Sequence, residues 1–539
     1  MKQIILFFIS VGAMLTAPSQ MLEQSIQQTY YQRYQTAANT LHKILQVNSN
    51  NTAAWYYLTK DYLLENKLQK AIDSIQLAPV EVKADPWYKV AYGALLLEQS
   101  KKEDAAGYFN SAIKDTKEKD AAILAAVADA QIQSKTGDVA YAIDLLNKAI
   151  KRDKKNASLY VLLGDAYMKS SNGSDAFKAY QQATEIDNSY AAAYHKLGEI
   201  FVTQKNPEMY VSYFQKAIAA DPNYAPSIYR LYVYEFNRNP ARAMEYYKDY
   251  LSKSDVSMEN QYDLADLFYL NKKYNEAIQK AHTIIKDQGE KVQPRLFKLI
   301  SYSYAEQKDS ANAFDYMQQY FSKEADSNKV AKDYLLMGNL YASVKKNDSL
   351  AFTCFEQAVA KERNASELLK YYKQFADLAA DHKNFSEQAK WLGRYYNASN
   401  KTTNIDLFNL ALAYYRSEQF AAADSAFGIY ISKYPDQSFG YYWQAKSKAL
   451  QDKDMSQGLA VDAYQKLIEV LEKNPNDANF KKWIVEAYAY LAAYETNTQK
   501  DYAEAVNYFE KVLEVDPENT DAKKYIDILE TNLDNKDSR

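Results

Sequence analysis

Glycine and proline are scarce in this sequence, with 13 and 11 copies in 539 residues. Tight turns depend on both residues, so their scarcity excludes a loop-rich all-β architecture. No two glycines are separated by a single residue and no glycine precedes a lysine, which excludes the dinucleotide-binding and P-loop fingerprints. Alanine, leucine, lysine, glutamate and glutamine, which favour helices, are common. The composition therefore predicts an all-α chain.

Cysteine and histidine are also rare. Cys354 is the only cysteine, so no intramolecular disulfide can form, and its place in a predicted helix favours a buried apolar role. The four histidines (His42, His195, His282 and His382) lie far apart, and none pairs with another at metal-ligand spacing. We therefore expect no catalytic residue, no metal site and no cofactor, and we predict that the protein is not an enzyme.

The chain has no strong excess of charge of either sign. Its 65 basic and 69 acidic residues are interspersed and give a net charge of −4. A nucleic-acid partner requires a basic patch, so nucleic acid is not expected. No segment after the first residues is long and apolar enough to cross a membrane, which leaves peripheral association with the cell envelope open.

The first residues have the pattern of a secretory signal peptide. Lys2 precedes an apolar run at residues 4–15, and the small residues Ala17 and Ser19 follow it. This order predicts a signal peptide at residues 1–19, with cleavage after Ser19 and export to the periplasm or cell envelope. A retained N-terminal anchor is the alternative.

Tyrosine is abundant, with 50 copies, and a repeat accompanies it. Between Asn156 and Asn223 one pattern occurs twice, 34 residues apart: aromatic, Leu-Gly, aromatic, then small, aromatic, small and a turn residue. Because a helix buries every third or fourth residue, these positions are predicted to pack the repeats together. The first copy has Tyr160, Leu163, Gly164, Tyr167, Ala176, Tyr180 and Ala183, and the second has Tyr194, Leu197, Gly198, Phe201, Tyr210, Phe214, Ala217 and Pro222.

This pattern resembles the tetratricopeptide repeat (TPR), whose units are pairs of antiparallel helices stacked into an α-solenoid. The resemblance implies one array from residue 21 to residue 519, with about 14 units of which several are degenerate. It also implies a polar capping helix at residues 520–534. Insertions are predicted near residues 451–457 and 496–500.

The resemblance further implies a concave groove that binds a protein or peptide, lined by residues one, four, eight and eleven places after the start of each unit. Two aromatic clusters occupy such positions. The alternative is that the superhelix closes there and buries them. The middle cluster has Tyr229, Val233, Phe236, Tyr262, Tyr269 and Tyr302, and the later one has Phe408, Leu412, Tyr415, Phe439, Tyr442 and Tyr488.

The sequence thus predicts a non-catalytic TPR scaffold for protein–protein interaction in the cell envelope. The alternative is a subunit of an envelope polysaccharide or secretion machine that contacts glycan or an outer-membrane protein. The peptide-carboxylate clamp of some TPR proteins is not expected, because the corresponding inner positions are Tyr56, Lys60, Val161 and Asp165.

Four Asp-Ser-apolar triplets resemble the O-glycosylation motif of Bacteroidetes periplasmic proteins, and together with the signal peptide and the tyrosine content they suggest a similar source. We predict that each lies where a second helix starts, and helix capping is the favoured interpretation of these residues. The triplets begin at Asp73, Asp309, Asp348 and Asp424.

Overall fold

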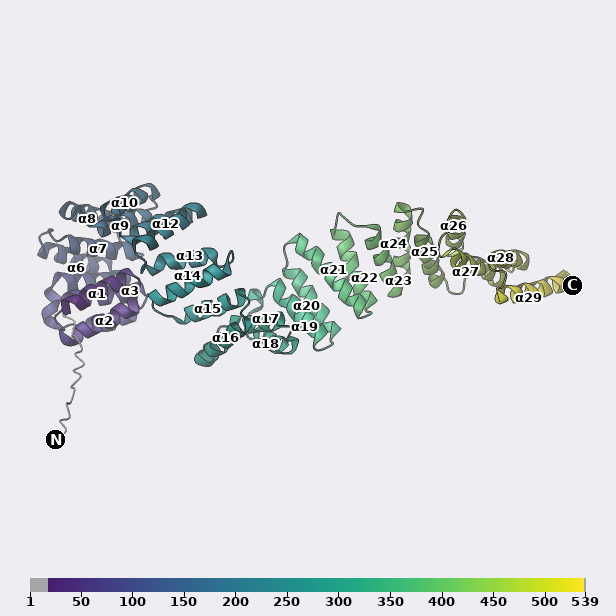
Figure 1. Cartoon of the computed structure of the whole chain (residues 1–539), viewed down its shortest axis with the longest axis horizontal. Coiled ribbons are helices and arrows are strands. Elements are labelled where there is room, and N and C mark those ends of the chain that lie inside the picture. Colours follow the sequence, from purple (N-terminus) through teal and green to yellow (C-terminus); the bar gives the residue numbers. More distant parts are fainter. Residues whose placement is uncertain (1–17, 538–539) are drawn as a thin grey trace, which may run out of the picture. The chain divides into compact units, whose positions relative to one another are not determined.

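The computed structural model describes residues 18–537, and every regular element in that range is a helix (Figure 1). The chain divides into two compact units, and the boundary in the sequence lies between Asp309 and Ser310. The helices of unit 1 are α1 (Pro18–Tyr30), α2 (Tyr34–Val47), α3 (Thr52–Leu64), α4 (Leu68–Gln76), η1 (Val80–Ala84), α5 (Pro86–Glu98), α6 (Lys102–Asp115), α7 (Ala121–Gln133), α8 (Val139–Arg152), α9 (Ala157–Lys169), α10 (Gly173–Ile186), α11 (Ala191–Thr203), α12 (Pro207–Ala220), α13 (Ala225–Glu235), α14 (Pro240–Lys253), α15 (Met258–Leu270), α16 (Tyr274–Gln288), η2 (Gly289–Lys291) and α17 (Arg295–Glu306).

Unit 2 continues the same alternation of helices. Its elements are α18 (Ser310–Lys323), η3 (Asp326–Asn328), α19 (Ala331–Ser343), α20 (Asp348–Lys361), α21 (Ala365–Asp381), α22 (Phe385–Ala398), α23 (Asn404–Arg416), α24 (Phe420–Lys433), α25 (Ser438–Gln451), α26 (Val461–Glu472), α27 (Phe480–Tyr494), η4 (Glu495–Gln499), α28 (Tyr502–Val515) and α29 (Thr520–Asp537). None of the helices in the described range is long and apolar enough to cross a membrane.

Asparagine and aspartate begin many of these helices. Their side-chain oxygens accept hydrogen bonds from backbone N–H groups that have no partner inside the helix. Asn156, for example, accepts from the Ser158 N–H at 3.1 Å at the start of α9. Other such N-caps are Asn51, Asp85, Asp120, Asp138, Asn172, Asn206, Asn239, Asn347, Asn364, Asn384 and Asp501.

The turns between paired helices adopt the left-handed conformation without glycine. After α3, Asn66 has φ 58°, and the Lys67 N–H bonds back to the Tyr62 carbonyl at 2.8 Å. This is the Schellman arrangement that ends many helices. The scarcity of glycine therefore does not prevent tight helical turns, because Gln32, Ser100, Ser171, Lys205, Lys272, Lys346, Lys383 and Glu418 adopt the same conformation.

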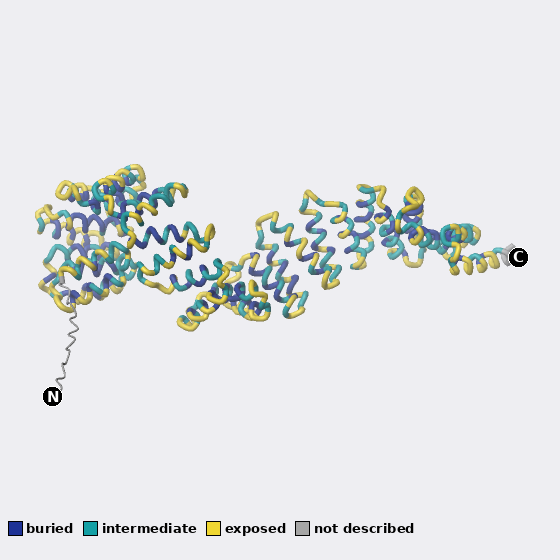
Figure 2. Tube along the Cα trace, viewed as in Figure 1, coloured by how far each residue is buried: buried dark blue, intermediate teal, exposed yellow. Residues whose placement is uncertain are grey.

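Paired helices pack through several of the residues that the repeat pattern predicts, whereas the predicted Pro222 is exposed, and half-buried are Tyr160, Tyr167, Tyr194, Phe201 and Tyr210. Tyr180, Ala183, Phe214 and Ala217 have no more than 1% of their surface exposed. Buried residues lie where helices face one another (Figure 2). The first helices α3, α5, α7 and α9 also contact one another from hairpin to hairpin, and we call these and the later odd-numbered helices of unit 1 the inner helices.

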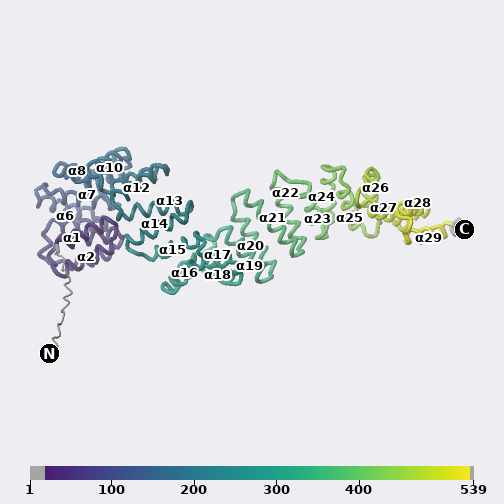
Figure 3. Tube along the Cα trace, viewed as in Figure 1, coloured from purple at the N-terminus to yellow at the C-terminus, as the bar shows by residue number. Residues whose placement is uncertain are grey.

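The N-terminal hairpin, α1 with α2, bonds to residues far along unit 1. Figure 3 shows the path of the chain by residue number. The Ala192 N–H donates to the Tyr30 hydroxyl at 3.1 Å, and the Tyr31 hydroxyl donates to Asp221 at 2.9 Å. The Tyr30 ring also lies 5.1 Å from the Tyr224 ring, between centroids. These contacts close unit 1 on itself.

The two ends of the chain and the two predicted insertions can be compared with the structure. Most of the predicted signal peptide, residues 1–17, lies outside the described residues, and α1 begins at Pro18. A loop between Gln451 and Val461 and the π-helical turn η4 confirm the two predicted insertions. The final helix α29 runs to Asp537, beyond the predicted cap.

The prediction that all four Asp-Ser triplets start a helix is wrong for two of them. Asp348 begins α20 and Ser310 begins α18, as expected. The triplets at Asp73 and Asp424 lie inside α4 and α24. Ser74 keeps only 8% of its surface exposed, because it faces the interior of its hairpin, so it is a poor acceptor for a glycan.

Candidate functional site

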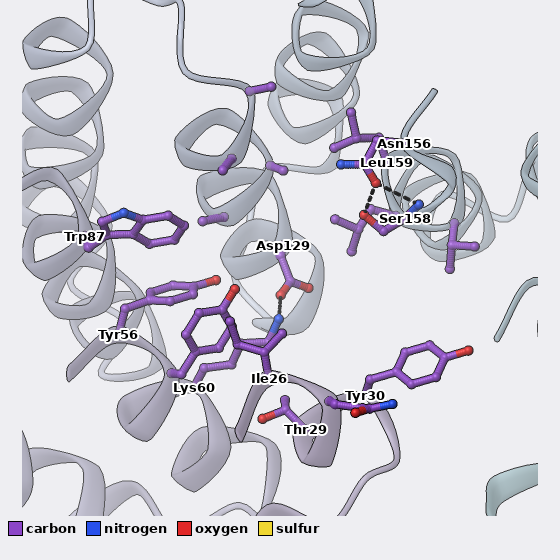
Figure 4. Close-up of a pocket in the computed structure, with 18 of the residues that line it drawn as sticks. Ile26, Thr29, Tyr30, Tyr56, Lys60, Trp87, Asp129, Asn156, Ser158 and Leu159 are labelled. Carbon is purple, nitrogen blue, oxygen red and sulfur yellow. Dashed lines mark hydrogen bonds and ion pairs between the residues drawn. The ribbon is translucent and has the colours of Figure 1, made fainter. Parts of the chain in front are cut away.

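A cavity of about 860 Å³ lies on the inner side of unit 1. Residues of α1, α2, α3, α5, α7 and α9 line it, and α1 forms one wall because the N-terminal hairpin closes the unit. Figure 4 shows Trp87 and Tyr56 across the cavity from Ser158, with Lys60 and Asp129 between them. The volume is in the range of sites that hold small ligands or several side chains.

An ion pair crosses this cavity. Lys60 Nζ of α3 lies 2.6 Å from Asp129 Oδ2 of α7, and the Asp129 side chain is only 6% exposed. Between these helices, α5 presents the short side chains Ala91 and Ala94 to an adjoining cavity of about 300 Å³, which leaves room for the lysine to reach across. Burial lowers the pKa of Lys60, but the charge of Asp129 outweighs burial and the net effect raises it. Gln133 donates to the other Asp129 oxygen at 3.1 Å.

Aromatic rings form much of the wall. The Trp87 ring lies 4.9 Å from the Tyr56 ring and 6.3 Å from the Tyr57 ring, between centroids. Burial raises the pKa of Tyr34 and of Tyr190 to about 12, so these phenols stay neutral. Among the described residues, the hydroxyls of Tyr34, Tyr56, Tyr57 and Tyr190 have no hydrogen-bond partner. Tyr56 is only 6% exposed, so the donors available to a ligand are the half-buried Tyr34, Tyr57 and Tyr190.

Three carboxylates line the cavity from its exposed edge. Glu23, Asp120 and Asp153 are exposed and form no ion pair within the described part of the chain. One oxygen of Asp120 accepts from the backbone N–H groups that begin α7. Lys60 is the only cation among the lining residues, and Asp129 neutralises it. The cavity wall therefore carries a net charge of about −3.

Further along the inner helices the acids are paired instead. Asp165 of α9 lies 2.8 Å from Lys196 of α11. Arg230 of α13 donates two parallel hydrogen bonds of 2.5 Å to Glu199 of α11. These two acids are thus neutralised by cations, unlike the three carboxylates at the edge of the cavity.

The middle cluster of predicted groove residues does not form one exposed surface. Tyr262 is 2% exposed, so its placement in the groove is wrong. The reason is that the next inner helix covers it: the Gln293 N–H donates to its hydroxyl at 3.0 Å, and Arg295 lies 4.8 Å from its ring centroid. Val233 is 47% exposed. The half-buried members are Tyr229, Phe236, Tyr269 and Tyr302.

The later cluster is divided in the same way. Tyr442 and Tyr488 are each 7% exposed, which corrects their prediction as groove residues. Tyr442 stacks on Trp483 of the following hairpin at 4.3 Å between centroids, and the Tyr488 hydroxyl donates to Glu472 at 3.0 Å. Phe439 is 42% exposed, and the half-buried members are Phe408, Leu412 and Tyr415.

A serine, a histidine and a glutamate align between α11 and α13. His195 Nδ1 lies 3.0 Å from Ser227 Oγ, and His195 Nε2 lies 3.6 Å from Glu199. Ser227 has no exposed surface, and burial lowers the pKa of His195 to about 3. A base this weak, beside a hydroxyl that no substrate can reach, does not activate a nucleophile. The three residues serve as a buried polar link between two helices.

Other reactive groups give no chemical site. Cys354 is half-buried on α20, and burial raises the pKa of its thiol to about 11, which disfavours the thiolate. Within residues 18–537 no group of His, Cys, Asp and Glu side chains is arranged to hold a metal ion.

The cavity residues follow the same offsets that gave the predicted groove. Counted from the first residue of each inner helix, Tyr56 and Ala125 lie four places on, and Lys60 and Asp129 lie eight places on. The offset rule therefore also applies to the N-terminal units, but the predicted groove contained only the aromatic clusters of later units. The contribution of α1 had no signal in the repeat pattern.

Comparison with protein families finds tetratricopeptide repeats in four stretches of the chain. The matches cover residues 128–191, residues 191–224 and 487–519, and residues 407–436. The chain thus contains tetratricopeptide repeats, which confirms the resemblance of the clear pair, and its fold is an all-α TPR solenoid. No curated protein matches it.

Several solved structures are similar to parts of the chain. The C-terminal part of a TPR repeat-containing protein from Cytophaga hutchinsonii is 27% identical, covers 49% of this chain and 98% of its own, and has a TM-score of 0.29. The TPR domain of P58(IPK) is 15% identical, covers 68% of this chain and 99% of its own, and has a TM-score of 0.24. YrrB, described as a TPR protein with an unusual peptide-binding site, is 15% identical, covers 36% of this chain and 98% of its own, and has a TM-score of 0.23.

Proposed function

We propose that this chain is a non-catalytic scaffold of the cell envelope that mediates protein–protein interaction by holding a segment of a partner protein in the inner cavity of unit 1. The cavity of about 860 Å³, lined by residues of α1, α2, α3, α5, α7 and α9, is the observation that carries the proposal. Rigid aromatic side chains such as Trp87 and Tyr57 supply contact area at little entropic cost. The apolar run at residues 4–15 supports the envelope location.

The alternative partner, a glycan, is less well served by the cavity. Sugar hydroxyls need free acceptors, but Asn156 already accepts from the Ser158 N–H at 3.1 Å and from its hydroxyl at 2.6 Å. Both oxygens of Asp129 are engaged as well. The free acceptors are the carboxylates Glu23, Asp120 and Asp153 at the exposed edge, whereas the interior of the cavity offers aromatic faces and phenol donors, which favour a peptide over an envelope polysaccharide.

A photo-crosslinking amino acid placed in the intact chain tests this function. Tyr57 lines the cavity, whereas Tyr108, which is 37% exposed, lies on the second helix α6. We expect the crosslinker at position 57 to capture a protein from the envelope and the crosslinker at position 108 to capture none. Equal yields at the two positions contradict the cavity as the binding site. A glycan adduct at position 57 supports the alternative function instead.

A further inference from the structure

The carboxylates at the cavity differ from two acids further along the inner helices, on α9 and α11, which are paired with cations. Asp165 and Glu199 have cationic partners within 3 Å, whereas Glu23, Asp120 and Asp153 have none in the part of the chain that the structure describes. Three like charges around one opening repel each other, and a ligand cation relieves that repulsion.

The aromatic rings of the cavity wall also favour a ligand with positive charge. Tyrosine and tryptophan rings carry negative charge on their faces and attract ammonium and guanidinium groups. Such faces line the cavity at Tyr56, Tyr57 and Trp87. Between them, the side chains of Ile26, Leu159 and the alanines of α7 are apolar. The cavity thus suits a chain segment with both basic and apolar side chains.

An acidic ligand meets the opposite situation. The one lining cation, Lys60, lies 2.6 Å from Asp129, whose second oxygen is also bonded. A ligand carboxylate has to compete with Asp129 for this ammonium group and then lies near three carboxylates that form no ion pair in the described part of the chain. The repulsion makes such a complex unfavourable.

We propose that the partner segment held in this cavity is a basic peptide, with lysine or arginine side chains next to apolar ones. The proposal rests on the proposed function, because it names the chemistry of the ligand for the same cavity. Lysine or arginine side chains lie against Glu23, Asp120 and Asp153, and the apolar side chains fill the space between the rings.

Selection from a display library of random nine-residue peptides on the intact protein tests the proposal. We expect the selected peptides to be enriched in lysine and arginine over aspartate and glutamate. The combined substitution Glu23→Gln, Asp120→Asn and Asp153→Asn should weaken their binding about tenfold at low ionic strength, and the loss should shrink at high salt. Asn at position 120 keeps the cap of α7, because asparagine caps helices as well as aspartate does.

The matched control removes three exposed, unpaired carboxylates from second helices through Glu185→Gln, Glu208→Gln and Glu276→Gln, and it should bind like the wild type. Neutral or acidic peptides from the selection, or equal binding by the two triple variants, overturn the basic ligand and leave the scaffold function standing. A selection that yields no peptide, with no protein crosslinked at position 57, overturns both. If the first triple variant melts early, Glu23→Gln with Asp153→Asn replaces it.

Discussion

Glycines of the first helices face aromatic rings of the second helices. A Cβ atom added at Gly93 or at Gly198 would lie 2.6 Å from the ring of Phe109 or Phe214. Gly164 faces Tyr180 and Gly338 faces Phe355 in the same way. These four glycines therefore set the distance between paired helices, and an L side chain at these positions cannot fit without movement.

Two glycine substitutions should have opposite effects on stability. Gly198→Ala should lower the free energy of unfolding by about 1–3 kcal/mol, because the new methyl group meets Phe214. Gly107→Ala should raise it by roughly 0.5–1 kcal/mol, because that helical glycine has open space around it. Thermal and urea unfolding of the two variants measure both changes. A Gly198→Ala protein as stable as the wild type would mean that the helices pack less tightly than described.

Asp61 gives the stability a dependence on pH. The carboxyl group has no exposed surface, one oxygen accepts from Thr29 at 2.8 Å and the other has no partner. Burial raises its pKa to about 7, and the negative charges of Glu65 and Asp255 add to the effect, while the Thr29 hydrogen bond and Lys60 oppose it. The folded state therefore binds a proton more tightly than the unfolded state, so stability falls as pH rises from about 4 to about 7.

Replacing this carboxyl should remove that dependence. Asp61→Asn keeps an acceptor for Thr29 but cannot ionise. We therefore expect its free energy of unfolding to be higher than that of the wild type by roughly 2–4 kcal/mol at pH 8, and by much less at pH 4. Urea unfolding at both pH values gives the comparison. A difference that does not change with pH would show that Asp61 ionises normally in the folded protein.

Tyr262 is a packing residue, and its substitution tests the correction made above. Tyr262→Ala should cost about 3–5 kcal/mol, because it leaves a cavity beside α17. Tyr262→Phe removes only the hydrogen bond from Gln293, which is worth roughly 1 kcal/mol. Tyr108→Ala, on an exposed site, is the control for melting experiments. A Tyr262→Ala protein that melts like the wild type would restore this tyrosine to the groove.

Helix α2 begins without a capping side chain of its own. Its N-cap residue, Arg33, makes no such bond. Asp255, which follows α14, takes the role: one oxygen accepts from the Gln35 N–H at 2.8 Å and the Thr36 N–H at 3.1 Å, and the other accepts from the Thr36 hydroxyl. A carboxylate 220 residues away thus satisfies the orphan N–H groups and the positive end of the helix dipole.

Loss of this cap should loosen the N-terminal hairpin before the rest of unit 1. Asp255→Ala should cost about 1–2 kcal/mol and speed amide hydrogen exchange in α1 and α2, because the closing contact is broken. Glu245→Ala, an exposed substitution on α14, is the control. Exchange that rises equally in α9 and α10 would mean that the hairpin does not open on its own.

The helical hairpins could be predicted because their signals are local. The spacing of Gly164 and Tyr180, or of Gly198 and Phe214, reflects contacts between neighbouring helices that every repeat makes for itself. The buried groove residues could not be predicted in this way, because the offset rule gives the side of a helix that faces inward but not how closely the next helix covers it. Tyr262 and Val233 both lie at positions that the offset rule places in the groove, but Tyr262 is 2% exposed and Val233 is 47% exposed.

At the scale of the whole molecule, the cavity depends on contacts that no local pattern contains. The bond between Tyr31 and Asp221 joins residues 190 positions apart. Such closure depends on the small rotation that each hairpin adds to the next, which a single sequence does not state. The cavity therefore depends on the packing of α1 against the later inner helices, which the repeat pattern does not contain.

Export of the chain is the prediction that concerns its whole mature form. Cleavage after Ser19 would remove only the first two residues of α1, Pro18 and Ser19. Every α1 residue that lines the cavity, from Glu23 to Tyr30, would remain, and so would the bonds of Tyr30 and Tyr31 to later helices. We therefore expect the mature protein to start at Gln20 and to keep the closed form of unit 1. Mass spectrometry of the N-terminal peptide from the envelope fraction measures this, and a chain that starts at Met1 in the cytosol would contradict both the export and the envelope location.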